Sequence, residues 1–138
     1  MFEISKIKNH LAENPDIVAA YLFGSAVSGE RVVNDLDILV LLDPKANRLN
    51  VQLELVSNLS RFTGLKADKI DVVIFDQEEV DPDILLTAIN HGMLLKNIDQ
   101  RFLSDRIDDL SQYYLKNEPM ILRAKRLEKE RLEAFCGR

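Results

Sequence analysis

The chain has 138 residues, of which 46% are hydrophobic and 30% charged, with a net charge of −5 at pH 7. Such a length suits one domain with a core of its own, and the acidic balance disfavours nucleic acid as the main partner, because nucleic acid selects basic surfaces. With Cys136 as its only cysteine the chain cannot form an intrachain disulfide. We find no apolar run that could span a bilayer and no signal-peptide pattern, so we expect a cytoplasmic protein without membrane contact.

Apolar spacing and turn signals divide the first part of the chain into alternating helices and strands. The strand over residues 36–42 is almost wholly apolar, which predicts burial on both faces and therefore helices on either side of a sheet. In chain order, we expect a helix over 2–14, strands over 17–23 and 36–42, a helix over 47–62, a strand over 69–75, a helix from Pro82 to about His91 and a short edge strand over 93–95.

Residues 99–138 have a different character. We expect two helices here, over 99–116 and 119–135, broken at Pro119. In the second helix, basic residues alternate with glutamates, which is more typical of a solvated or partner-contacting surface than of an RNA-binding face. The expected organisation is a core over 1–98 and a C-terminal helical extension over 99–138, both in the same domain.

The most informative stretch begins at a glycine turn and ends at two carboxylates. Gly24 follows a predicted strand and is joined to Ser25, so the turn offers free N–H groups and a hydroxyl to a phosphate. Asp35 and Asp37 open the next strand, and alternate residues of a strand project from the same face. Two carboxylates held so close repel each other, and a divalent cation that prefers oxygen ligands relieves this. We therefore expect a nucleoside triphosphate bound through its phosphates and magnesium.

A third carboxylate, Asp71, interrupts an otherwise apolar strand. On its own, an aspartate facing water at a strand end is the simpler explanation. With Asp35 and Asp37 already present, we favour a three-carboxylate site. Such a site suits nucleotidyl transfer, in which two metal ions about 3.5–4 Å apart stabilise the attacking and leaving oxygens. Asp35 and Asp37 would bridge the metals, and Asp71 would bind the metal on the acceptor side and accept the hydroxyl proton.

These residues resemble the nucleotidyltransferase superfamily related to DNA polymerase beta. The short chain is similar to the minimal nucleotidyltransferase (MNT) branch, and the helical tail resembles the MntA antitoxin family of HEPN/MNT toxin–antitoxin systems. The resemblance implies an α/β fold with a small mixed β-sheet nucleotidyltransferase core flanked by helices. It also implies transfer of AMP from ATP to a tyrosine of a cognate HEPN ribonuclease toxin, contacted through the C-terminal helices and the active-site face.

The resemblance carries roles to individual residues of this chain. It implies that Gly24 and Ser25 contact the triphosphate, and that Asp35, Asp37 and Asp71 are the metal-binding and catalytic carboxylates. The chain departs from the usual pattern in three places. Nine residues separate Ser25 from Asp35 where ten are common, Ala26 replaces a frequent arginine, and Asn34 replaces a frequent serine. None of these changes removes a metal ligand.

Two alternatives remain open at this point. The protein could neutralise its partner by direct binding through residues 99–138, with a site that no longer catalyses. It could also transfer a nucleotide to a small molecule, although the chain shows no second domain to enclose such an acceptor.

Overall fold

The computed structural model describes residues 4–24, 35–76 and 79–136 of the chain. The chain forms two compact units, Met1–Leu103 and Ser104–Arg138. The predicted division into a core over 1–98 and an extension over 99–138 within one domain stays a prediction. None of the described helices is long and apolar enough to cross a membrane.

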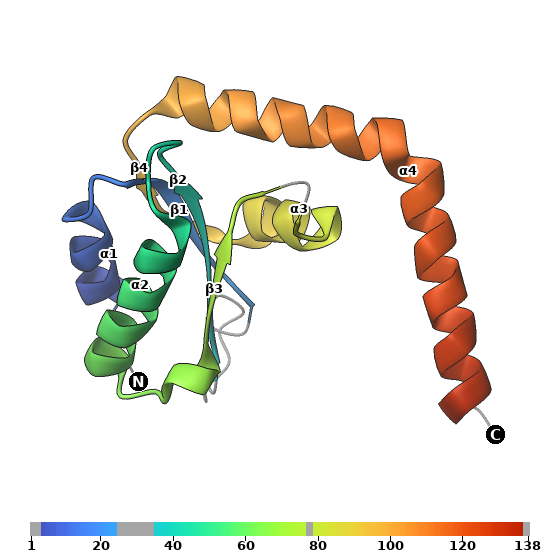
Figure 1. The fold of residues 1–138 in the computed structure, drawn as a ribbon, viewed down its shortest axis with the longest axis horizontal. Coiled ribbons are helices and arrows are strands. Elements are labelled where there is room, and N and C mark those ends of the chain that lie inside the picture. Colours follow the sequence, from blue (N-terminus) through green and yellow to red (C-terminus); the bar gives the residue numbers. More distant parts are fainter. Residues whose placement is uncertain (1–3, 25–34, 77–78, 137–138) are drawn as a thin grey trace. The chain divides into compact units, whose positions relative to one another are not determined.

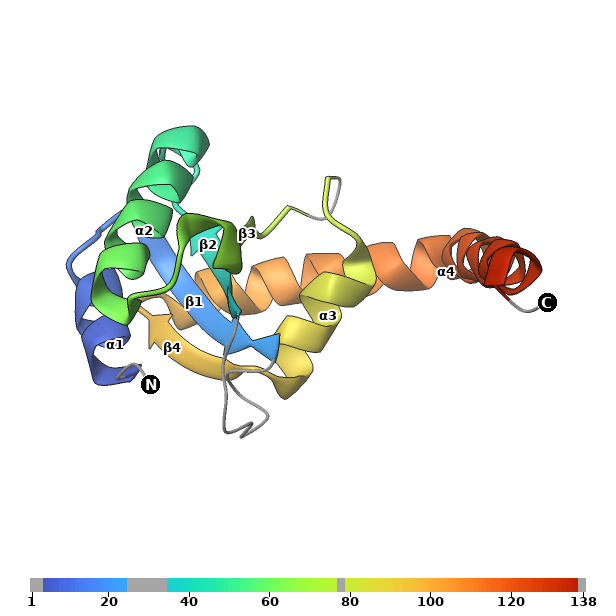
Figure 2. The same cartoon turned by 90° about the horizontal axis from the view of Figure 1, so that it is seen from below.

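The first unit is built on a four-stranded mixed sheet with the strand order β3-β2-β1-β4 (Figure 2). β1 runs antiparallel to both β2 and β4, whereas β2 and β3 are parallel. The strands are β1 (Ile17–Phe23), β2 (Leu36–Leu42), β3 (Ile70–Ile74) and β4 (Met93–Asn97). β1 and β2 have the predicted bounds, and β4 is an edge strand as expected, although longer.

Helices cover both faces of this sheet, as the apolar strand over 36–42 predicts (Figure 1). α1 (Ile4–Ala12) and α2 (Arg48–Thr63) pack on one face, where the core joins their buried side chains to alternate residues of the strands. α3 (Pro82–His91) lies on the opposite side and contacts β1 and β4. The fully buried members of the core are Ile7, Leu11, Ile17, Ala20, Leu22, Leu36, Ile38, Val40 and Leu59.

Local signals set the ends of these helices. Asn47 caps α2, because its side-chain oxygen accepts a hydrogen bond from the Asn50 N–H at 3.1 Å. Gly64 ends the same helix in the left-handed conformation with φ +76°, as its position after the apolar pattern predicts. Asp81 caps α3, and Pro82 occupies the first turn. The ends of α2 and α3 are therefore set by residues that adjoin each helix in the sequence.

Lys96 on β4 ties the end of α1 to the sheet. Its side chain is buried, and Nζ donates hydrogen bonds to the carbonyl oxygens of Leu11 at 2.8 Å and Asn14 at 2.7 Å. These carbonyls lie at the C-terminal end of α1, where a positive charge also suits the helix dipole.

The second unit corrects one prediction. α4 runs without interruption from Gln100 to Cys136 and contains Pro119, so the predicted break at this proline is wrong. A proline inside a helix removes one backbone hydrogen bond and bends the axis, but the flanking turns keep the helix continuous. Figure 1 shows this change of direction within α4. Asn117 adds a local contact in the same turn, because its Nδ2 donates to the Tyr113 carbonyl at 2.8 Å.

Candidate functional site

Two carboxylates meet across the parallel strands β2 and β3. The sheet register pairs Asp37 with Asp71, and neighbouring strands lie about 4.7–4.9 Å apart. The flanking residues Leu36 and Ile38 enter the core with α1 and α2. Because side chains alternate along a strand, Asp37 projects from the opposite face. The same alternation beside Ile70 and Val72 brings Asp71 to that face. The side chains thus come from positions 34 residues apart in the sequence.

Asp35 directly precedes β2 and is exposed. It is two residues from Asp37, and strand alternation places it on the same side of the sheet. Gly24 follows β1, whose last residue, Phe23, is the register partner of Asp37. The predicted phosphate contact Ser25 lies outside the described residues.

Gly24 and Asp37 are in direct contact. Gly24 has φ +77°, a conformation that favours glycine. A Cβ atom at this position would collide with the Asp37 carboxylate. Both the backbone conformation and the lack of a side chain are therefore needed where the glycine turn approaches the acidic pair.

The electrostatic environment of Asp37 reflects this crowding. Burial raises the pKa of its carboxyl group above the ordinary value, and the negative charges of Asp71 and Asp35 raise it further. Asp71 and Asp35 therefore act on Asp37, which is half-buried, whereas both of these neighbours are exposed. An ionised Asp37 is costly here without a cation, and a bound divalent ion would favour the charged form.

The donor set fits an oxygen-preferring metal such as magnesium. Among the described side chains, no three His, Cys, Asp or Glu residues come close enough together to enclose a metal ion. Magnesium commonly takes one or two protein carboxylates and completes its coordination with substrate phosphates and water. A pair of carboxylates beside Gly24 is compatible with that requirement.

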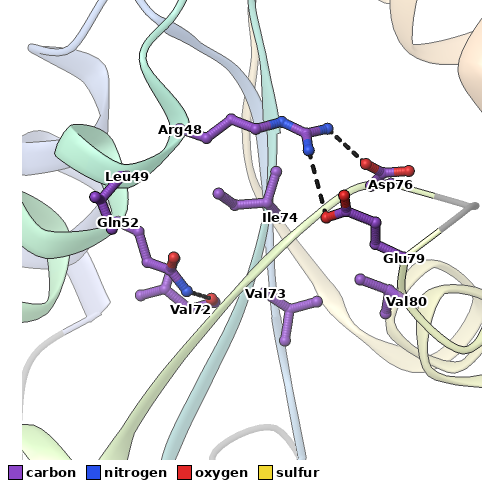
Figure 3. A pocket seen from close by; sticks show the side chains of 9 residues that line it. All are labelled: Arg48, Leu49, Gln52, Val72, Val73, Ile74, Asp76, Glu79 and Val80. Atoms are coloured by element: carbon purple, nitrogen blue, oxygen red, sulfur yellow. Dashed lines mark hydrogen bonds and ion pairs between the residues drawn. The ribbon is translucent and has the colours of Figure 1, made fainter.

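A cavity of about 410 Å³ lies along the outer edge of β3, and the sequence did not reveal it (Figure 3). α2 supplies one wall through Arg48, Leu49 and Gln52, and the segment after β3 supplies another. Arg48 Nη2 lies 2.8 Å from Asp76 Oδ2, and Arg48 Nη1 lies 3.6 Å from Glu79 Oε2. The only sequence signal for this cavity is Gln52, a polar residue half-buried in α2.

The fold is that of a nucleotidyltransferase domain. Residues 5–101 match the family model for polymerase beta nucleotidyltransferases. This match covers most of the chain, and the protein belongs to that family.

The structural neighbours narrow the comparison to minimal nucleotidyltransferases. A toxin–antitoxin structure with AMP-PNP aligns with a TM-score of 0.65 and 21% identity, covering 89% of this chain and 98% of the neighbour. A structure of the toxin–antitoxin MntA-HepT aligns with a TM-score of 0.59 and 20% identity, covering 88% of this chain and 96% of the neighbour. A complex of tri-AMPylated Shewanella oneidensis HEPN toxin with MNT antitoxin aligns with a TM-score of 0.58 and 18% identity, covering 89% of this chain and 99% of the neighbour. No significant match was found among curated proteins. This chain thus has an MNT fold that resembles MntA.

Proposed function

We propose that the protein is a magnesium-dependent antitoxin that transfers AMP from ATP to a tyrosine of a cognate HEPN ribonuclease toxin. The observation that carries this proposal is the register pair of Asp37 and Asp71 beside the Gly24 turn. This arrangement supports the proposal, because two carboxylates suit a magnesium ion and a nearby glycine turn suits the phosphates that the ion would bind.

Each candidate residue has a role in this reaction. Asp35 and Asp37 hold magnesium, and the Gly24–Ser25 turn contacts the triphosphate. When bound, magnesium neutralises the charge that develops on the phosphate oxygens. In the proposed reaction Asp71 would bind the metal on the acceptor side and accept the proton of the incoming hydroxyl.

The bonds balance as follows. The tyrosine oxygen forms a bond to the α-phosphorus of ATP, and the bond from that phosphorus to the oxygen bridging to the β-phosphate breaks. Pyrophosphate leaves with the electron pair of the broken bond, and the hydroxyl proton goes to Asp71. The product is a tyrosine with AMP attached through a phosphodiester.

The neighbours support the choice of nucleotide and partner. Their descriptions name AMP-PNP in one case, and an AMPylated HEPN toxin bound to an MNT antitoxin in another. For this chain we propose that α4 and the active-site face contact the toxin. Since the reaction consumes ATP, we place it in the cytoplasm.

The proposal is tested by mixing the protein with ATP labelled at the α-phosphate, magnesium and the helical protein encoded by the adjacent gene. We expect label on a tyrosine of that protein, and inactivation of a molar excess of it. Asp37→Asn and Asp71→Asn should each abolish transfer. Asp68→Asn is the matched control, because Asp68 is exposed on the short 3-10 helix η2 (Ala67–Lys69) that precedes β3.

Two results would contradict the proposal. Transfer that survives Asp37→Asn would remove the catalytic role of the acidic pair. Neutralisation that needs one antitoxin per toxin and no ATP would instead favour inhibition by direct binding.

A further inference from the structure

The outer edge of β3 offers backbone groups that no strand among the described residues pairs with, because β3 is the terminal strand of the sheet. The Phe75 N–H donates to the Val40 carbonyl of β2 at 2.8 Å. Since alternate residues direct their backbone groups to opposite edges of a strand, those of Val72 and Ile74 point outward. Gln52 confirms this direction, because its Nε2 donates to the Val72 carbonyl at 2.9 Å.

The cavity of about 410 Å³ follows this edge (Figure 3). Val72 and Ile74 line it together with Leu49 of α2 and Val80 beyond the strand. Exposed strand edges are usually protected, because they pair readily with other chains. Here the edge borders a hollow lined by both apolar and polar side chains, which provides backbone partners and space for side chains. This combination is the basis of recognition by strand addition.

The register of the sheet connects this edge to the acidic pair. A strand added to β3 would place one of its residues beside Asp71, as Asp71 itself lies beside Asp37. The side chain of that residue would project from the face that carries both carboxylates. Asp71 is exposed and would therefore be the first carboxylate that this side chain meets.

We propose that the groove along β3 is the acceptor site for an extended peptide segment of the partner, which adds to the sheet as a fifth strand and presents a hydroxyl-bearing residue next to Asp71. This inference rests on the proposed function, because it names the site that receives the acceptor in that reaction.

The chemistry of the groove favours an uncharged or basic peptide. Its charged lining residues are one cation and two carboxylates, Arg48, Asp76 and Glu79, which leaves one net negative charge before Asp71 is included. A small molecule would not match outward backbone groups that repeat along the strand. A second copy paired β3 to β3 would bring two acidic edges together, which like-charge repulsion opposes.

Ile74 provides a matched pair of variants. Ile74→Pro removes the outward N–H but leaves the β2–β3 ladder, because proline is tolerated where the N–H faces away from the sheet. Ile74→Ala loses a similar amount of side chain and keeps the N–H. The probe is a pool of eight-residue peptides with a central tyrosine and randomised flanks, mixed with magnesium and ATP labelled at the α-phosphate. Both variants lose the Ile74 side chain from the groove, so we expect each to label the pool less than the native chain, and Ile74→Pro to label it at least about tenfold less than Ile74→Ala.

Two further measurements do not depend on turnover. Binding of a fluorescent ATP analogue should be equal in both variants, because the groove is separate from the triphosphate seat. In NMR spectra of the full chain with AMP-PNP and magnesium, the best peptide should shift the amides of Val72 and Ile74. N-methylation of the peptide amides that point toward β3 should abolish these shifts. N-methylation of the amides between them, which point away from β3, should leave the shifts unchanged.

The outcomes separate the two proposals. Equal labelling by Ile74→Pro and Ile74→Ala would overturn the groove and leave nucleotidyl transfer standing. Amide shifts at the edge without label on any peptide or protein would support the groove and overturn the reaction. Label on the whole partner, with no peptide bound at the edge, would overturn the groove. A dimer that Ile74→Pro dissolves would do the same by identifying a second copy as the occupant.

Discussion

Asp37 is partly buried between two other acidic side chains, and its raised pKa reflects the cost of ionising it there. Like charges held so close repel one another, which disfavours the folded chain when no cation is bound. Burial also disfavours the charge of Lys96, but this side chain has hydrogen-bond acceptors beside it. It is a buried charge that stabilises the fold by donating to carbonyls at the end of α1.

Asp37→Asn should stabilise the protein in the absence of metal. A carboxyl group whose pKa is raised by folding binds more protons in the folded state, so stability falls as pH rises above the ordinary value of 3.8. At neutral pH the variant avoids this loss, and we expect its Tm in EDTA to rise by about 2–4 °C. Scanning calorimetry between pH 4 and 7 should show a flatter profile than for the native chain.

With magnesium and AMP-PNP present, the native chain should have a higher Tm than Asp37→Asn. Magnesium and AMP-PNP should raise the Tm of the native chain and not that of Asp37→Asn, because only a protein that binds the ligand gains stability from it. Asp68→Asn should follow the native chain in both conditions. If Asp37→Asn is less stable than the native chain in EDTA, the ionised Asp37 carboxylate does not destabilise the fold.

Lys96→Met should destabilise the fold by about 1–3 kcal/mol, because the Leu11 and Asn14 carbonyls lose their donor. Lys8→Met is the control, since Lys8 is exposed on α1, and it should change stability by less than about 0.5 kcal/mol. Urea unfolding measures both. Equal stabilities of the two variants would refute the structural role of Lys96.

The same lysine predicts a pH dependence. Burial lowers the pKa of Lys96 below its ordinary value of 10.5, so the unfolded chain binds the proton more readily than the folded one between the two values. The contribution of Lys96 to stability therefore increases as pH rises toward 10.5. Lys96→Met should remove this slope, and a slope unchanged by the substitution would argue against it.

At the scale of elements, local signals predicted well where they act within a few residues. The apolar run of β1, the almost wholly apolar run of β2, the cap at Gly64 and the first-turn proline Pro82 could be recognised from nearby residues alone. Pro119 was misjudged because its local effect, the loss of one hydrogen bond, is smaller than the cost of ending a helix that is favoured on both sides.

Two glycines should respond differently to the same substitution. Gly92 has φ −82°, which any residue adopts, but a Cβ there would meet the Leu22 carbonyl at 2.8 Å and the Ala88 carbonyl. Gly64 has φ +76° and open space around it. We expect Gly92→Ala to cost about 1–3 kcal/mol through backbone crowding, and Gly64→Ala about 1 kcal/mol through conformation alone.

Asparagine separates these causes. Because asparagine tolerates the left-handed conformation, Gly64→Asn should recover part of the loss, whereas Gly92→Asn should be at least as damaging as Gly92→Ala. Denaturant midpoints compare all four variants. If asparagine recovers stability at Gly92 and not at Gly64, then backbone crowding is not the cause at Gly92 and backbone conformation is not the cause at Gly64.

At the scale of the whole molecule, the site was harder to predict than its parts. The sequence indicated that Asp35, Asp37 and Asp71 belong together, but the pairing of Asp37 with Asp71 depends on the register of two strands joined by a crossover helix. No local pattern fixes such a register. The groove beside β3 was missed for the same reason, because its walls come from α2, β3 and the segment after it.

The two compact units predict separable contributions to stability and partner binding. Beyond Leu110, no described side chain of α4 is buried. A chain that ends after Gln112 should therefore unfold within about 1 kcal/mol of the full chain. Under the proposed function it should bind AMP-PNP equally and fail to neutralise the partner, because it lacks most of α4. Calorimetry and a toxin-inhibition assay test this. A truncated chain that still neutralises the toxin would place the contact elsewhere.

The pairing of Asp37 with Asp71 depends on a strand of only five residues at the edge of the sheet. Detachment of β3 alone would separate Asp71 from Asp37 while the other three strands stayed joined, so the site can come apart before the protein does. Warming should then extinguish activity below the calorimetric Tm. A peptide paired with β3 would stabilise this strand in the sheet. Under both proposals, binding of the acceptor would therefore stabilise the site that modifies it.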